Sequence, residues 1–218
     1  IPMDGQEGIQ HLINVHIRAN DDVNVPSAML YAIWNPQLVG MMVRHSPQEY
    51  ILQIPYFPPY QTMERNFTLE QVQTMVEAAF GTAQGISIES IRPWTMSSLI
   101  ARRYVSKNVG GVLVGDAAHV FPPAGGFGMN TGLQDVHNLA WRLSLWHKHG
   151  HQAEQLESLL SQYESERRPV AQRNAALSVR NYRRILELTK ACYLNDEHPS
   201  LLVRLLDQMT LLPLSTRQ

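Results

Sequence analysis

Alternating apolar and polar residues mark the first part of the chain. Between Ile13 and Ile17 every second residue is apolar, which is typical of a strand with one buried face. Further apolar runs are separated by Asn-Pro and Ser-Pro turns, and such short links join antiparallel neighbours. These runs cover residues 28–34, 38–43 and 50–54. Residues 9–57 are therefore predicted to form an antiparallel sheet, which Pro55, Pro58 and Pro59 end.

Helical periodicity follows the sheet. Thr68 and Gln71 form a capping-box pattern and Gly81 is a typical helix stop, which predicts a helix over 69–80. Two more strands are predicted, one from Ile86 to Ile91 before Pro93 and a short buried one over 109–114. Three helices then follow, with Pro169 between the second and the third, and a short apolar segment comes last. The ranges are about 129–150, 153–167, 170–190 and 201–206.

The order of these elements, a sheet, a helix, a strand and then helices, predicts an α+β fold. We divide the chain into a sheet domain with one helix at 1–105, a second domain at 106–190 and a helical tail at 191–218.

Composition narrows the class of protein. Of 218 residues, 44% are hydrophobic and 17% are charged, which favours a folded chain. The net charge of -1 and the lack of a matching motif argue against a nucleic-acid-binding module. A single cysteine excludes an internal disulfide and a zinc site of several thiolates. Since no signal peptide and no membrane-length apolar run is present, we expect an intracellular, soluble protein.

The segment from Val114 to Gly132 carries the candidate chemistry. A buried strand leads to Asp116, two prolines and several glycines follow, and a long helix then begins. Glycines allow a planar ring to approach the backbone closely, and the free N–H groups of a helix start suit an electron-rich acceptor. The Asp116 carboxylate could accept hydrogen bonds from sugar-like hydroxyls. The pattern predicts a ligand cradle.

This segment resembles the GD motif of the class A flavin-dependent monooxygenases, the family of para-hydroxybenzoate hydroxylase and phenol hydroxylase. Residues 91–96, 134–143 and 163–169 also resemble that family, and the resemblance covers most of residues 9–185. It implies a part of the para-hydroxybenzoate hydroxylase-like FAD/NAD(P)-binding α/β fold, with a substrate-binding sheet and the C-terminal part of an FAD-binding domain. The implied activity is hydroxylation of an aromatic, phenolic substrate with FAD, NAD(P)H and O₂.

The resemblance also implies roles for individual residues. Asp116 would hold a ribityl hydroxyl of FAD, and the Pro123 carbonyl would lie near the reacting edge of the isoalloxazine. The glycines would pass beneath the ring, and the N–H groups of Met129 and Asn130 would face its N1 atom and C2 carbonyl. No catalytic residue and no metal site are assigned. The implied cofactor-binding residues are Gly115, Asp116, Pro123, Gly125, Gly126, Gly128, Met129 and Asn130.

The chain departs from the family pattern at its beginning. It has no G-x-G-x-x-G unit after a first strand, because Gly126-Phe127-Gly128 follows prolines instead, and Asp4-Gly5 lacks the expected Ser and Arg after it. We therefore expect the C-terminal part of a monooxygenase, without roughly the first 150–200 residues, with the N-terminal FAD-binding half as its partner. The alternative is a non-catalytic remnant that keeps the fold.

Each of the other candidate residues has a structural and a functional interpretation. His119 is expected to be packed or capping rather than a general base. His147, His149 and His151 are expected at a helix terminus rather than on a metal. The basic residues between 167 and 190 are expected on a solvated face or against the missing domain. Aromatic residues could wall a substrate pocket or fill the sheet core: Trp34, Tyr56, Phe57, Tyr60 and Trp94.

Overall fold

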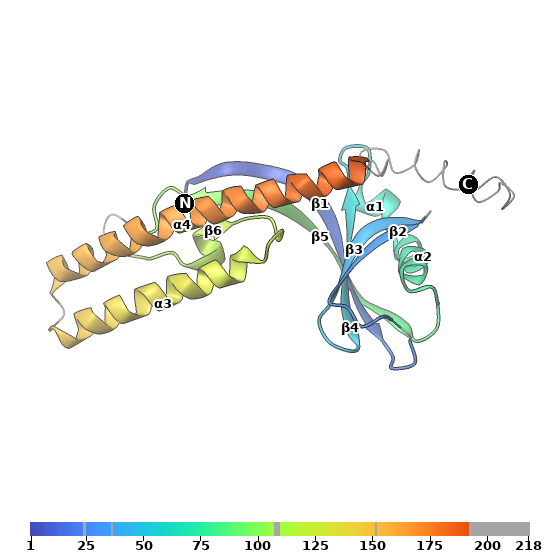
Figure 1. Cartoon of the computed structure of the whole chain (residues 1–218), viewed down its shortest axis with the longest axis horizontal. Coiled ribbons are helices and arrows are strands. Elements are labelled where there is room, and N and C mark those ends of the chain that lie inside the picture. Colours follow the sequence, from blue (N-terminus) through green and yellow to red (C-terminus); the bar gives the residue numbers. More distant parts are fainter. Residues whose placement is uncertain (24, 36, 107–109, 151, 192–218) are drawn as a thin grey trace, which may run out of the picture. The chain divides into compact units, whose positions relative to one another are not determined.

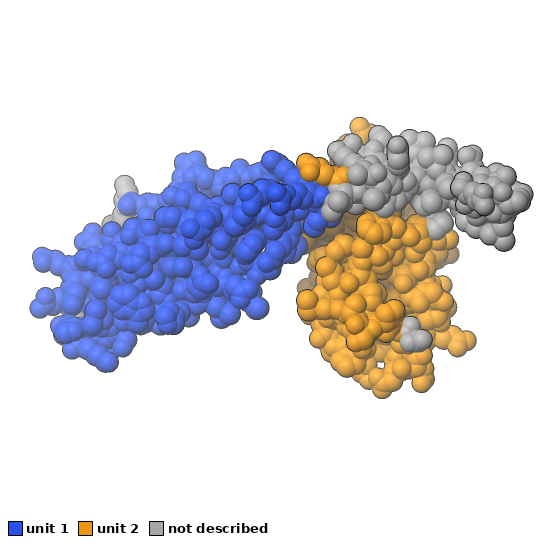
Figure 2. Space-filling model, in the orientation of Figure 1, with its two compact units in different colours: residues 1–9, 96–185 blue, residues 10–95, 186–218 orange. Residues whose placement is uncertain are grey.

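The chain forms two compact units in a computed structural model that describes residues 1–23, 25–35, 37–106, 110–150 and 152–191. Unit 1 contains residues 1–9 and 96–185, and unit 2 contains residues 10–95 together with the described residues 186–191 (Figures 1 and 2). The predicted domain boundary between residues 105 and 106 separates the substrate-binding part from the FAD-binding part. It stays a prediction, because compact units do not test a division by function. The predicted tail and the apolar segment 201–206 lie outside the described residues.

The strands form one sheet in the order β2-β3-β4-β1-β5-β6. The bounds are Met3–Ala19 for β1, Leu30–Asn35 for β2, Leu38–Arg44 for β3, Glu49–Tyr56 for β4, Ile86–Ala101 for β5 and His119–Val120 for β6. β1 pairs with β4, β2 with β3, β3 with β4 and β5 with β6, all antiparallel; in the first pair Val15 lies opposite Leu52. The predicted α+β fold with an antiparallel sheet is confirmed.

The prediction that the strand after residue 86 ends before Pro93 is wrong, because β5 continues to Ala101. β5 lies between β1 and β6, but β6 pairs only with Leu99 and Ile100. At Pro93 the strand therefore has a neighbour on one side only, and proline is tolerated there because its missing N–H is not needed for a ladder.

Helix α2 (Leu69–Phe80) covers one face of the unit 2 sheet (Figure 1). The predicted capping box is present, since Thr68 accepts from the Gln71 N–H and the Gln71 side chain accepts from the Thr68 N–H. Gly81 ends the helix with a left-handed φ of 73°. Val72 and Val76 are fully buried against the sheet. A short helix that the pattern did not predict, α1 (Met63–Asn66), comes just before α2.

In unit 1 two long helices run side by side in opposite directions (Figure 1). They are α3 (Phe127–Lys148) and α4 (Ala153–Ala191). The predicted break at Pro169 is wrong, since α4 continues through it. An interior proline costs about 3 kcal/mol, and contacts on both sides of it offset that cost. Before the proline, Arg167 binds α3 and Arg168 binds the Ala101 carbonyl; after it, Asn174 binds Thr131.

The predicted short strand over 109–114 is also wrong within the described residues. Residues 110–114 contain only an isolated bridge between Val105 and Val112, next to a hydrogen bond from the Leu113 N–H to the Tyr104 carbonyl. The segment continues into a single 3-10 turn, η1 (Gly115–Ala117). Among the described residues the segment thus has one bridge in place of a strand ladder.

Leu52 tests the importance of the unit 2 core, because it is fully buried between Val15 and Met42. Leu52→Ala is expected to lower the free energy of unfolding by about 2–5 kcal/mol, since it leaves a cavity under α2. Urea unfolding followed by circular dichroism measures this. Leu69→Ala, at a side chain that is 65% exposed, is the control and should change stability by less than about 0.5 kcal/mol. Equal losses in the two variants would contradict this core.

Candidate cofactor site

The Gly-Asp turn, which we define as residues 115–118, lies against the first turns of α3. Gly115 has a left-handed φ of 55°, a conformation that glycine adopts without strain. A Cβ atom on Gly132 of α3 would lie 3.2 Å from the Gly115 Cα atom. The two glycines therefore allow the turn and the helix to approach closely, which places Asp116 beside the helix start.

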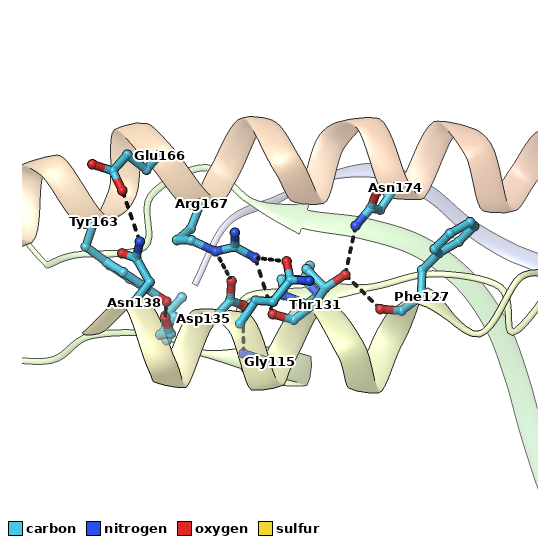
Figure 3. A network of polar contacts seen from close by, with 12 residues as sticks. Gly115, Phe127, Thr131, Asp135, Asn138, Tyr163, Glu166, Arg167 and Asn174 are labelled. Atoms are coloured by element: carbon cyan, nitrogen blue, oxygen red, sulfur yellow. Dashed lines mark hydrogen bonds and ion pairs between the residues drawn. The ribbon is translucent and has the colours of Figure 1, made fainter. Parts of the chain in front are cut away.

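The buried Asp135 carboxylate of α3 fixes this turn (Figure 3). Its Oδ2 atom accepts from the Gly115 N–H at 3.3 Å and from the His119 Nε2–H at 2.7 Å. Its Oδ1 atom accepts from Arg167 Nε of α4 at 2.8 Å. Arg167 also donates to the Thr131 carbonyl and to Gln134. One carboxylate thus joins the turn, β6 and both helices.

Burial raises the pKa of Asp135, but the hydrogen bonds from His119 and Arg167 outweigh burial and hold the pKa below its ordinary value of 3.8. The carboxyl is therefore ionised at neutral pH and can only accept hydrogen bonds, so His119 must donate through Nε2. Arg167 supplies the countercharge that a buried carboxylate requires.

His119 is packed, as expected. Its side chain is fully buried, and its ring stacks on Phe121 with centroids 5.1 Å apart and planes within 10°. Its Nδ1 atom and the Tyr104 hydroxyl have no hydrogen-bond partner among the described residues. Burial raises the pKa of Tyr104 and of Tyr163, so both phenols stay neutral at physiological pH. These groups form the interior wall of the Gly-Asp turn and are closed to substrate.

The side of this segment that faces away from the helices carries the residues assigned to the cofactor. Asp116, Pro123, Gly125 and Gly126 are exposed, and the Asp116 carboxylate makes no hydrogen bond or ion pair with any described residue. A Cβ atom on Gly126 or Gly128 would meet nothing within 4 Å. An open glycine surface beside a free carboxylate fits a planar ring with a polyol chain.

The helix begins two residues earlier than predicted, at Phe127, with Gly126 as its N-cap at a φ of 66°. In such a helix the Met129 N–H is one of the free donors of the first turn, whereas the Asn130 N–H is the first to pair with the Gly126 carbonyl. The Asn130 side chain also donates to that carbonyl, at 2.9 Å. Met129 and Asn130 are both exposed.

The remaining candidates are the histidines near the end of α3 and the basic residues of α4. No group of three or more metal-binding side chains occurs in the described parts of the chain, and His151 lies outside them. His147 is in the last turn of α3, as expected for a helix terminus. Arg167 and Arg168 differ from the expected solvated face, since both are engaged within unit 1. The described helices include none that is long and apolar enough to cross a bilayer.

The aromatic candidates divide between core and surface. Tyr56 packs against Phe67 and His11, and Phe57 lines a small cavity of about 130 Å³ in unit 2. Trp34 and Tyr60 are exposed, and Trp94 is half-buried.

Sequence patterns assign no role at this site to Asp135 or Arg167, although both lie in stretches that resemble the family. Their helical positions look like ordinary surface positions on α3 and α4. The available signal is that Asp135, Thr131 and Arg142 share one side of α3 while its apolar residues lie on another.

Comparisons with known proteins identify the family to which the chain is related. A family model described as an FAD binding domain matches residues 1–178. The chain is 42% identical over 116 residues to the tetracenomycin A2 monooxygenase-dioxygenase of Streptomyces glaucescens, which covers 53% of this chain and 20% of that protein. It is 38% identical over 137 residues to the 4-methyl-5-nitrocatechol 5-monooxygenase of a Burkholderia species, covering 62% and 23% of the two chains.

A solved structure of aklavinone-11 hydroxylase with FAD and aklavinone is similar in fold, with a TM-score of 0.71 and 26% identity over 83% of this chain and 33% of that one. The chain therefore spans between a fifth and a third of the length of these relatives.

Asp135→Asn tests the buried carboxylate. An amide places an N–H group against either His119 or Arg167, and breaking a buried charge pair costs about 3–5 kcal/mol. Because the pKa of Asp135 is lowered in the folded chain, its contribution to stability is complete above the ordinary carboxyl pKa and is lost as pH falls. Urea unfolding should show a difference between parent and variant that is large at pH 7 and shrinks below about pH 4.

The control for this prediction is Glu157→Gln, at an exposed position of α4. It removes a carboxylate without breaking a buried pair and should leave stability within about 0.5 kcal/mol. A loss in Asp135→Asn that is the same at pH 7 and pH 3 would show that its charge does not stabilise unit 1.

Proposed function

The chain belongs to the family of FAD binding domains whose model it matches, and from this we propose that it is the C-terminal portion of a class A flavin-dependent monooxygenase. The proposed reaction is hydroxylation of an aromatic, phenolic ring with NAD(P)H and O₂. Bound FAD supplies the redox chemistry, so the protein itself needs no nucleophile or metal. The observation that carries the proposal is the exposed surface of the Gly-Asp turn and the glycine loop, with the unpaired Asp116 carboxylate beside it.

In this proposal Asp116 accepts a hydrogen bond from a ribityl hydroxyl, and Gly115 gives the turn that presents it. Gly125, Gly126 and Gly128 let the isoalloxazine approach the backbone, and the Pro123 carbonyl lies near its reacting edge. Support comes from the open space beside Gly126 and Gly128 and from the left-handed backbone at Gly125 and Gly126.

The start of α3 stabilises negative charge on the ring in this proposal. The free Met129 N–H and the positive end of the helix dipole are fixed before reaction, so they need no reorganisation as charge develops. Asn130 completes the pair that the family resemblance implies, although its N–H is shared with the Gly126 carbonyl. The first turn holds no acidic side chain that would oppose this charge.

The α3 stripe, which we define as Met129, Leu133, Val136 and Leu143, supports a missing N-terminal half. These side chains are between 39% and 75% exposed and lie on one side of the helix. The buried side of α3 instead carries polar residues, among them Thr131, Asp135 and Arg142. This is the reverse of an ordinary surface helix, so we propose that an N-terminal dinucleotide-binding unit covers the stripe.

Unit 2 is proposed to contact the aromatic substrate through the sheet face opposite α2. Met41, Gln53 and Asn14 lie side by side across β3, β4 and β1 on that face. Gln53 donates to Asn14 at 3.3 Å. All three side chains are half-buried, and they lie on the face away from the core that α2 covers. Amide groups beside an apolar side chain suit orientation of a hydroxylated ring.

A chimera tests the cofactor role. It joins this chain behind the N-terminal segment of the Streptomyces glaucescens relative, and FAD affinity is measured by fluorescence titration. Asp116→Ala removes an acceptor worth about 1.5–3 kcal/mol, so the dissociation constant should rise roughly tenfold to a hundredfold. Glu157→Ala is the control at an exposed carboxylate of the same unit. Equal constants for the parent chimera and Asp116→Ala would refute the ribityl contact, and a parent without flavin would favour the remnant.

Substitutions in the α3 stripe test the missing half. We expect the 218-residue chain to self-associate in light scattering, and Leu133→Ser with Val136→Ser to make it more monomeric, because less apolar surface is exposed. In the chimera the same pair should lower the melting temperature, since each buried apolar side chain contributes about 1.5–3 kcal/mol. His137→Ser, at an exposed polar position of α3, should change neither. A chimera as stable with the double substitution as without it would show that the stripe stays uncovered.

A further inference from the structure

The side of α4 that faces α3 forms a row of hydrogen-bond donors. Tyr163 donates to the Leu113 carbonyl at 2.7 Å, and Arg167 donates to Asp135 and to the Thr131 carbonyl. One to two turns further along, Asn174 donates to Thr131 Oγ1 at 2.9 Å (Figure 3). Ser178 and Asn181 continue the row at helical spacing. Each acceptor lies in the segment that leads to the Gly-Asp turn or follows it.

The last two donors hold the Pro-Gly loop, which we define as residues 121–126. Ser178, fully buried, donates to the Pro122 carbonyl. Asn181 donates through its Nδ2–H to the Ala124 carbonyl at 3.3 Å. The Pro123 carbonyl between them accepts from the Gly126 N–H at 3.0 Å, which closes a turn. Three consecutive carbonyls of the loop are therefore fixed, two of them by α4.

The loop depends on these contacts because its own residues do not fix the path of its backbone. Prolines 122 and 123 have no N–H to pair, and Gly125 and Gly126 have left-handed φ values that leave the backbone with many alternatives. The loop makes no strand pairing beyond Val120. Its path between β6 and α3 therefore depends on side chains from a helix that lies more than 50 residues later in the sequence.

We propose that Ser178 and Asn181 are positioning residues for the cofactor: they set the path of the Pro-Gly loop, and so the place of the Pro123 carbonyl and of the glycines that approach the ring. This inference rests on the proposed function. Neither side chain touches the exposed surface of the loop, since both bind its carbonyls from the helix side. Their effect on the cofactor is transmitted through the backbone.

Asn181→Asp is the sharpest variant, because it keeps the shape of the side chain and replaces the donor with an acceptor facing the Ala124 carbonyl. Ser178→Ala removes the hydroxyl without adding volume and serves as a milder second variant. Gln172→Glu makes the same amide-to-acid change at an exposed position of α4 and is the matched control.

The first measurement is hydrogen exchange of the 218-residue chain, read by mass spectrometry. Both variants should exchange faster in peptides that cover residues 121–131, while the rest of α3 and α4 keeps the protection of the parent. Faster exchange throughout both helices would show a general loss of stability and would overturn the proposal. Unchanged exchange in the loop would overturn it as well.

The second measurement uses the chimera loaded with FAD. Asn181→Asp should raise the FAD dissociation constant about tenfold and shift the flavin absorption bands and midpoint potential, whereas Gln172→Glu should not. A constant, a spectrum and a potential equal to those of the parent would overturn the proposal. If the parent chimera binds no FAD, the proposed function fails, and the exchange experiment still decides whether Ser178 and Asn181 hold the loop.

Discussion

The Asp135 carboxylate, which is shielded from solvent, needs a countercharge and several donors, and unit 1 is arranged around that need. Arg167 provides the charge, while Gly115 and His119 provide donors from the turn and from β6. Each partner lies on a different element, so one ionised group fixes the relative position of four segments. The local dielectric makes this arrangement strong when it is complete and costly when one partner is lost.

The segment from 113 to 131 has two sides with different tasks. Its inner side is fully engaged with α3 and α4, through Asp135, Arg167 and the donors that follow on α4. Its outer side carries the exposed Asp116 carboxylate and the exposed glycines 125 and 126. The helices supply the order that the sequence of this glycine-rich loop does not, as the proposed binding of a rigid ring requires.

Local signals predicted those parts of the fold that local chemistry decides. The capping box at Thr68, the left-handed stop at Gly81 and the sheet of unit 2 follow from neighbouring residues, and the glycine-rich segment leads to the proposed cofactor site. Contacts between distant residues decided the rest. α4 passes through Pro169 because Arg167, Arg168 and Asn174 anchor it on both sides, and no local pattern contains that information. For the same reason no local pattern identifies Asp135 as the residue that joins these elements.

The α3 stripe changes how amino-acid substitutions at this helix should be interpreted. Solvent exposure is normally taken as a sign that a position tolerates change, and burial as a sign that it does not. On α3 the stripe is apolar and exposed, whereas the buried residues Thr131, Asp135 and Arg142 are polar. If an N-terminal unit covers the stripe, as proposed, a serine at Leu133 is harmless in this chain and harmful in the complete enzyme. Tolerance at such a position is then a property of the whole polypeptide, and a survey of variants made on the shorter chain would rank them in the wrong order.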